Sequence, residues 1–427
     1  MGDTEAAAPA TGRRRELDAM RLLVVFGLFL FHSALIFDPT DDYYVKNPDT
    51  SSVVTYAAAL CVVWAMPLLF LVAGMGSWFS LRRRSARSFA EARLLRLGVP
   101  LVAGTLLLMP IPQWYRLRAA DPAYTGSYLS FWGEFLHVRL AAEEFPFVLD
   151  GAGRRPSFET GQLWFLVLLL TFSLLFLPLL AWMRGPSGAC ALARLGASAR
   201  RSWPILVVPA VLLAAVGAGL ELEEGFAAWN RWSYALFFLF GFAVAAQPAV
   251  FAAMRRLRGP AAFLGAVLWI ASFALYSIAD REGVDPLTSY DGVSMLFRAT
   301  FGVTGWVWLV AILGFAQRPV REAPSTGEGA ASRSARLGAW GNEAALPLYV
   351  IHQPVIVAIA FTVVGWTAPS IVKYIVIVAA SFAICVVLYE WLIRPFRLTR
   401  FLFGMTTGRT PGGQLARSPL DFRRARS

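Results

Sequence analysis

Residues 21–37 read RLLVVFGLFLFHSALIF, a run of apolar side chains that holds two ionisable groups, Arg21 and His32. A run of this length and composition is typical of a helix that crosses a lipid bilayer. Ionisable groups inside such a helix are costly, so they are rare and usually functional. The run therefore predicts both a membrane fold and a place where chemistry can occur.

The two ionisable groups share one face of the predicted helix. His32 follows Arg21 by eleven positions. At about 100° and 1.5 Å per residue, this spacing puts both groups on one side, about 16 Å apart along the axis. Asp18, three residues before Arg21, falls on nearly the same face.

This stripe has two interpretations. In the functional one, His32 is a neutral imidazole that accepts a proton from an attacking hydroxyl, and Arg21 holds an anionic group at the cytoplasmic mouth of the bundle. In the structural one, His32 bonds a neighbouring helix, and Arg21 and Asp18 form an ion pair at the membrane interface.

The composition of the whole chain supports a membrane protein. Of its 427 residues, 57% are hydrophobic and 15% are charged, whereas about a quarter of the residues of an ordinary soluble protein are charged. We therefore predict an all-α, polytopic membrane helix bundle. Apolar stretches long enough to span a bilayer predict ten transmembrane helices, at about 20–37, 53–80, 94–115, 162–183, 203–220, 231–250, 261–279, 296–317, 345–366 and 369–394.

The charge distribution predicts the orientation. With the N-terminus inside, the cytoplasmic segments hold most of the 39 Lys and Arg, and the opposite segments hold most of the 27 acidic residues. This is the positive-inside pattern, and it predicts that both termini are cytoplasmic. Because topology accounts for the net charge of +12, we expect no nucleic-acid partner.

We expect five parts along the chain. A cytoplasmic tail covers 1–15 and the membrane domain covers 16–400. Within the domain, the long loop 116–161 lies outside, as a binding segment or lid or as a plain surface loop. The Ser-, Gly- and Ala-rich stretch 318–343 is a flexible cytoplasmic linker, and 401–427 is a disordered cytoplasmic tail.

Three further groups attract attention. Arg93 and Arg96, in RSFAEARLLRLGVP, are spaced i, i+3 on one face of the third helix; they either clamp phosphate groups at the cytoplasmic face or simply anchor the helix. His352 lies between two prolines in the ninth helix, where we interpret it as a polar contact that stabilises a kink. His137 is interpreted as a loop histidine.

Several chemistries lack a sequence signal. The 3 Cys form no CxxC pair or disulfide pattern. No HExxH, GxSxG or Walker-type motif is present in the sequence, so we expect no metal site and no nucleotide hydrolysis.

The sequence resembles the membrane acyltransferase-3 family. Residues 17–32, LDAMRLLVVFGLFLFH, resemble the first-helix signature Leu-Asp-x-x-Arg with a His after ten further residues. MPLLFLVAGMGSWFSLRRRS (66–85) and FAEARLLRLGVPLVAG (89–104) resemble its second and third helices. TGQLWFLVLLLTFSLLF (160–176) resembles the fourth helix of the branch that includes glucan biosynthesis protein C, a periplasmic-glucan succinyltransferase. LPLYVIHQPVIV (346–357) resembles the penultimate helix.

The resemblance implies an enzyme of about ten spans that moves an acyl group from cytoplasmic acyl-CoA to a hydroxyl or amine of a carbohydrate or lipid-linked glycan near the outer face. It implies that His32 is the catalytic residue and Arg21 its companion, with Asp18 on the same stripe, and that Arg93 and Arg96 handle the donor. We expect acyl-CoA as a co-substrate, no permanently bound cofactor, and a multi-pass location in the bacterial inner (plasma) membrane.

Two other classes remain open. A transporter or exporter of an acyl donor or glycan would also be polytopic, but it would usually need coupling carboxylates near the midplane. Here Asp18 and Glu390 lie near the ends of predicted helices and Glu343 precedes one. A structural or assembly protein would leave the Arg21–His32 stripe unexplained.

Overall fold

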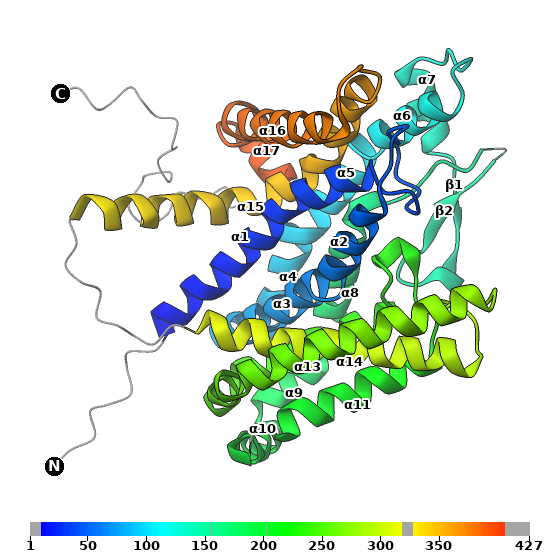
Figure 1. The fold of residues 1–427 in the computed structure, drawn as a ribbon. Coiled ribbons are helices and arrows are strands. Elements are labelled where there is room, and N and C mark those ends of the chain that lie inside the picture. Colours follow the sequence, from blue (N-terminus) through cyan, green and yellow to red (C-terminus); the bar gives the residue numbers. More distant parts are fainter. Residues whose placement is uncertain (1–9, 154, 202, 318–327, 406–427) are drawn as a thin grey trace. The chain divides into compact units, whose positions relative to one another are not determined.

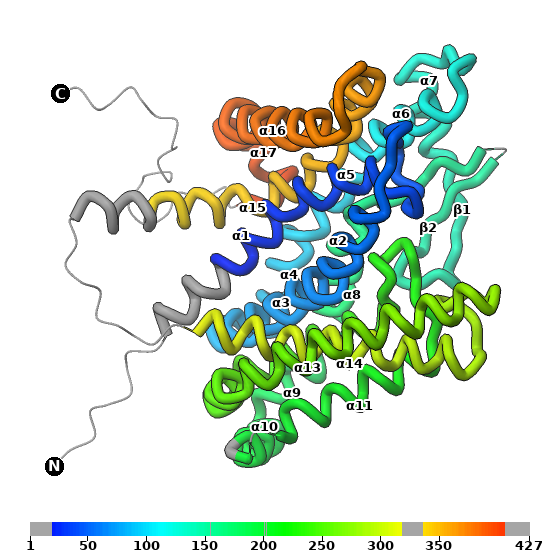
Figure 2. Tube along the Cα trace, in the orientation of Figure 1, coloured from blue at the N-terminus to red at the C-terminus, as the bar shows by residue number. Residues whose placement is uncertain are grey.

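The computed structural model describes the backbone of residues 10–153, 155–201, 203–317 and 328–405. The side chains of 10–18, Arg200 and 328–335 lie outside that description. Figure 2 draws the remaining parts of the chain in grey.

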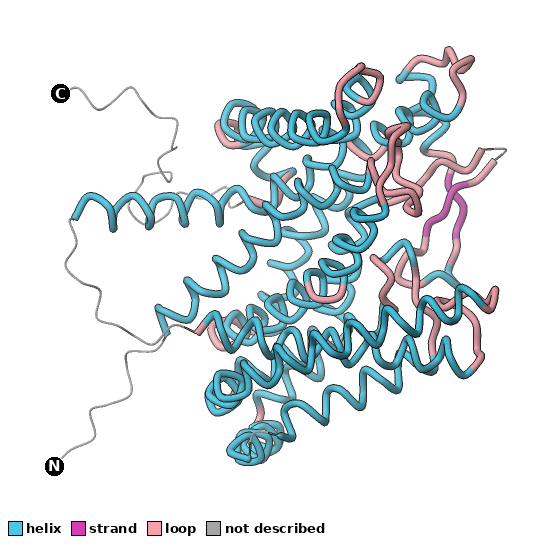
Figure 3. Tube along the Cα trace, viewed as in Figure 1, coloured by secondary structure: helices cyan, strands magenta, loops and turns pink. Residues whose placement is uncertain are grey.

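The described chain is helical almost throughout (Figures 1 and 3). Its helices are α1 Ala10–Leu35, α2 Ser52–Val62, α3 Ala65–Leu81, α4 Ala86–Arg93, η1 Leu94–Gly98, α5 Val99–Leu107, α6 Pro110–Ala120, α7 Tyr128–Phe135, η2 Ala142–Glu144, η3 Gly161–Leu163, α8 Trp164–Leu175, α9 Leu177–Arg184, α10 Pro186–Ser198, η4 Ala199–Arg201, α11 Trp203–Gly219, η5 Glu224–Phe226, α12 Arg231–Ala246, α13 Pro248–Arg281, α14 Gly292–Ala316, α15 Glu328–Val363, α16 Ser370–Leu388, η6 Tyr389–Ile393 and α17 Arg397–Leu402.

One small antiparallel hairpin interrupts the helices, drawn in magenta in Figure 3. Its strands are β1 (Val138–Leu140) and β2 (Leu149–Gly151), and Arg139 pairs with Asp150 in their register. The Arg139 guanidinium also donates to the Asp150 carboxylate at 2.7 Å, across the pair. The prediction of an all-α membrane protein is confirmed apart from this hairpin.

Long apolar helices make this a multi-pass membrane protein. Six helical segments are long and apolar enough to cross a membrane, and up to 8 qualify if each bent pair counts as one span. Two shorter apolar helices, Ala19–Leu35 and Arg231–Ala246, accompany them. Each of the ten predicted ranges falls on helix, while the number ten itself and the side of the termini stay predictions.

The expected chain parts need correction in three places. Helix α15 already begins at Glu328, so the predicted linker 318–343 is wrong from there on, and 318–327 lie outside the described residues. Composition misled because small residues suggested flexibility, although the Ala, Arg and Leu among them are strong helix formers. Helix α1 likewise begins at Ala10, inside the expected tail.

The third correction concerns the ends of the outer loop and the C-terminal tail. The range 116–161 holds the end of α6, helix α7 and the hairpin, so it is a folded subregion. Helix α17 continues to Leu402, two residues into the tail predicted at 401–427. Residues 406–427 of that tail lie outside the described residues.

Clustering of contacts divides the chain into two compact units. Unit 1 comprises 1–17, 59–90 and 172–321, and unit 2 comprises 18–58, 91–171 and 322–427. In unit 1, α3 and α12 pack with their backbones in contact. A Cβ on Gly74 would lie 1.9 Å from the Phe238 carbonyl oxygen, and one on Gly241 would lie 1.9 Å from that of Leu71. Such small-residue contacts are typical of helices packed in membranes.

Candidate active site

Helices α1 and α15 of unit 2 lie side by side and run in the same direction (Figure 1). Partway along each helix, a Cβ on Gly341 would lie 2.9 Å from Leu22. Farther along, the ring centroids of His32 and His352 are 5.1 Å apart. The sequence separation between the two residues is nearly the same in both contacts. The two helices are therefore parallel, and residues advance along them together. Their shared seam therefore has an arginine end, at Arg21, and a histidine end about 16 Å away.

His352 lies at the histidine end, and one of its ring nitrogens is already hydrogen-bonded. Its side chain is fully buried, and its Nδ1 lies 2.6 Å from the Tyr349 carbonyl oxygen. A carbonyl only accepts hydrogen bonds, so this bond assigns the proton to Nδ1. The Nε2 of the neutral ring then carries a lone pair. This atom is buried and has no hydrogen-bond partner among the described residues.

His32 faces His352 and is half-buried. Its Nδ1 is buried and also lacks a partner in the described part of the chain. The ring stacks on Tyr43, with centroids 6.1 Å apart, and the Tyr43 hydroxyl is a third buried polar atom with no described partner. Most buried polar atoms in proteins are hydrogen-bonded, so three unsatisfied ones at one point mark a site prepared for a polar group.

The loop after α1 brings Tyr43 to the histidines. Lys46 donates to the carbonyl of Leu35, in the last turn of α1, at 2.8 Å and to the Asp41 carbonyl at 2.8 Å. A cation at this position is favourable because the C-terminal end of a helix is partially negative. The bonds fold the loop back over the end of α1, and Tyr43 is thereby held against His32.

Tyr44 connects the same loop to the end of the long loop. Its hydroxyl donates to the Glu159 carboxylate, and the Tyr43 and Tyr44 rings meet edge to face at 5.4 Å. Burial raises the pKa of Glu159 above its ordinary value, although hydrogen bonds from Tyr44 and Gln113 oppose the shift. Burial, and then the Glu159 charge, raise the pKa of Tyr44 well above its ordinary value.

Gln162 and Tyr349 make a second connection between the long loop and α15. The Gln162 amide donates to the Val350 carbonyl at 3.1 Å, and the Tyr349 hydroxyl donates to the Gln162 carbonyl. The C-terminal end of the loop is thus bonded to elements on both sides of the histidine pair. Sequence reasoning missed Tyr43, Tyr44 and Glu159, although an acid directly before an apolar span is a usable signal.

The predicted arginines lie on α1, α4 and η1. Arg21 is half-buried in α1, about 16 Å along the helix from His32. Arg93 is the last residue of α4, but Arg96 lies in the π-helical segment η1. The shared face of Arg93 and Arg96, and their contact with phosphate groups, stay predictions. The side chain of Asp18 lies outside the described residues.

The carboxylates that a transporter might have used are paired with arginines. Glu343 accepts a hydrogen bond from Arg400 at 3.1 Å, and Glu390 accepts one from Arg394 at 2.9 Å. Trp340 also donates to Glu390, at 2.5 Å. This network joins α15, η6 and α17, and its pairing favours a structural role.

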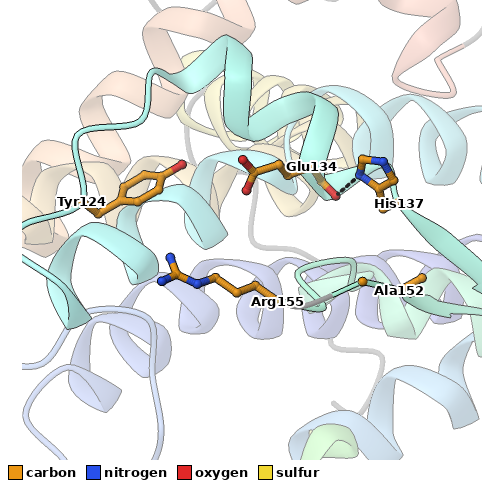
Figure 4. A pocket seen from close by; sticks show the side chains of 6 residues that line it. Tyr124, Glu134, His137, Ala152 and Arg155 are labelled. Carbon is orange, nitrogen blue, oxygen red and sulfur yellow. Dashed lines mark hydrogen bonds between the residues drawn. The ribbon is translucent and has the colours of Figure 1, made fainter.

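The long loop contains a pocket of about 410 Å³. Figure 4 shows Tyr124 and Glu134 on one side of it and Arg155 opposite. The His137 Nδ1 lies 3.3 Å from the Glu134 carbonyl oxygen, and the ring is exposed, as expected of a loop histidine. Across the described ranges, no group of three or more His, Cys, Asp or Glu is placed to hold a metal ion.

The fold and the site define a membrane-embedded helical protein with a buried histidine pair. A family model described as an acyltransferase domain matches residues 14–390. The chain therefore belongs to the membrane acyltransferase-3 family, and it is an acyltransferase that transfers groups other than aminoacyl groups. No curated protein and no solved structure matches it significantly.

Proposed function

We propose that this enzyme moves an acyl group, acetyl or succinyl, from cytoplasmic acyl-CoA to a hydroxyl of a glycan or related acceptor at the outer face of the bacterial inner membrane. One observation carries the proposal: in a member of an acyltransferase family, His32 faces a second histidine across 5.1 Å, with unsatisfied nitrogens on both rings. His32 acts either as the general base on the hydroxyl or as a transient carrier of the acyl group.

The donor enters from the arginine end of the α1–α15 seam. Coenzyme A phosphates dock on Arg93 and Arg96. Arg21 assists at the mouth, and Asp18 belongs to the same predicted stripe. The pantetheine arm is a flexible chain that extends along the seam, so the thioester reaches His32, about 16 Å from Arg21. The coenzyme is a co-substrate and leaves after each turnover.

The acceptor approaches from the opposite side. Ten spans with both termini cytoplasmic place the loop 116–161 and its pocket outside, in accord with the charge pattern of the sequence. The loop ends at Gln162, whose amide bonds α15 beside His352, so an acceptor held by the loop has a short path to the histidines. The second-to-fourth-helix segments support the branch of glucan biosynthesis protein C, and hence a glucan acceptor.

A label-transfer assay tests the proposal. Membranes that contain the wild type or His32→Ala are given radiolabelled acetyl-CoA and succinyl-CoA together with extracted cell-envelope glycans. We expect label in the glycan with the wild type alone. Equal label with both proteins would remove His32 from the mechanism. Label that accumulates inside sealed vesicles without covalent attachment would instead support the transporter alternative.

A further inference from the structure

His352 has the properties of a second reacting group rather than of a structural contact. A structural histidine inside a helix bundle generally uses both nitrogens, because an unsatisfied buried polar atom is costly. Here one hydrogen bond, from Nδ1 to the Tyr349 carbonyl at 2.6 Å, fixes the ring. The same bond leaves the lone pair of Nε2 buried and without a described partner.

The two rings are direct neighbours at the contact of α1 and α15. Their centroids are 5.1 Å apart and their planes are tilted by 47°. His32 Nδ1 and His352 Nε2 form no hydrogen bond with each other, since both lack any partner in the described chain. A hydroxyl that binds beside the two rings could donate to His352 Nε2 while it attacks a carbon bound to His32.

We infer that His352 is a second catalytic residue, whose Nε2 takes the proton of the acceptor hydroxyl as that hydroxyl attacks an acyl group carried by His32. The inference rests on the proposed function and selects the covalent route for His32. It also explains why His352 is fully buried whereas His32 is half-buried: the acyl carrier must meet the donor, and the base must only meet the hydroxyl.

The two steps balance as follows. A ring nitrogen of His32 attacks the thioester carbonyl, a C–N bond forms and the C–S bond breaks; the coenzyme A sulfur takes the proton that the ring releases. The acceptor oxygen then attacks the acyl carbon, a C–O bond forms and the C–N bond breaks, and the hydroxyl proton moves to His352 Nε2. Transfer of that proton to His32 returns both rings to the neutral state.

His352→Asn separates a catalytic from a structural role. The Asn amide can reach the position of Nδ1 and donate to the Tyr349 carbonyl, but it offers nothing at Nε2. His352→Gln places an amide near Nε2 that lacks basicity. Ser381→Ala is the matched control. Like His352→Asn, it changes a buried polar side chain of unit 2 that has an atom without a described partner.

The experiment follows the two half-reactions in purified protein. With acetyl-CoA or succinyl-CoA and no acceptor, we expect the wild type, His352→Asn and Ser381→Ala to release about one coenzyme A thiol per protein, with label retained on the chain, and His32→Asn to release none. After extracted envelope glycan is added, transfer by His352→Asn should be about 10²–10⁴-fold slower than by the wild type. Ser381→Ala should match the wild type.

Three outcomes would overturn the inference. Transfer by His352→Asn within twofold of the wild type would make His352 structural. A folded His352→Asn that releases no thiol would assign it to donor binding or the first step. Absence of a retained label in a wild type that does modify the glycan would exclude the covalent route. A wild type that modifies no glycan contradicts the proposed function itself, and the inference falls with it.

Discussion

Arg298 in unit 1 and His352 in unit 2 are both fully buried ionisable residues of apolar helices, yet their surroundings differ. Arg298 donates from Nε to the Gly217 carbonyl at 3.0 Å and from Nη1 to the Ser289 carbonyl at 2.6 Å. His352 bonds backbone carbonyls of its own helix, Tyr349 among them, and its Nε2 is buried without a described partner. The Arg298 Nη2 also lacks a described partner, so the comparison teaches that an unused polar atom identifies a site only when a second unused group, here the His32 ring at 5.1 Å, lies beside it.

Replacing Arg298 should have the largest effect on stability. Arg298→Met would leave several buried carbonyls without their donor, and each hydrogen bond to a charged group contributes about 1.5–3 kcal/mol. We expect a loss of about 3 kcal/mol or more and a sharp fall in folded protein, measured by thermal unfolding in detergent. A stable Arg298→Met protein without acyl transfer would break the comparison, because it would make Arg298 functional.

Gly241→Ala tests packing in unit 1 without touching a polar group. The new Cβ would meet the Leu71 carbonyl oxygen at 1.9 Å, so α3 and α12 must separate, at a cost of about 1–3 kcal/mol. Gly133→Ala, where a Cβ meets nothing within 4 Å, is the control. Equal unfolding temperatures for the two variants would show that the close helix contact is absent.

Replacing Arg93 or Arg96 should weaken binding of the acyl-CoA donor. If Arg93 and Arg96 bind the donor phosphates as proposed, Arg93→Gln and Arg96→Gln each remove a charge-assisted contact worth about 1.5–3 kcal/mol. We expect KM for acyl-CoA to rise about tenfold or more with kcat little changed, measured by steady-state transfer. A fall in kcat at constant KM would place these arginines in the chemistry and would contradict the assignment of separate ends.

The smallest expected effect is a pH-dependent change at Glu159. Burial raises its pKa above the ordinary value of a glutamate, so the protonated form is the one that folding favours. The stability that this group contributes is present at acidic pH and is lost as pH rises through the raised pKa. Glu159→Gln should therefore gain stability relative to the wild type from acidic to neutral pH, in paired unfolding curves. An opposite slope would show that the Tyr44 hydrogen bond to the carboxylate dominates.

Local patterns in the sequence predict most of the helices and half of the site. Hydropathy places helix in every range expected to span, because an apolar run in a membrane protein has few alternatives. The spacing from Arg21 to His32 correctly puts them along one helix, since that distance depends only on helix geometry. The composition of 318–343 does not predict the start of α15. Its small residues suggest flexibility, whereas the Ala, Arg and Leu among them favour a helix.

The remainder of the site depends on contacts between distant parts of the chain. Nothing local to His352 indicates that it faces His32, and a histidine between two prolines reads equally well as a kink contact. Tyr43 reaches the pair only because Lys46 caps α1 and folds the loop back. The π-helical turn at Arg96 arises inside an ordinary helical sequence, so neither hydropathy nor spacing predicts it.

The central claim is that the histidine pair takes part in acyl transfer and does not merely stabilise the fold. The variant His32→Asn tests this claim most directly. Unfolding temperature and transfer of labelled acyl groups from acyl-CoA to envelope glycan would be measured in the same purified preparation, beside the wild type and Ser381→Ala. The account predicts an unfolding temperature close to that of the wild type and no detectable transfer. Transfer at the wild-type rate, or loss of the folded protein, would contradict it.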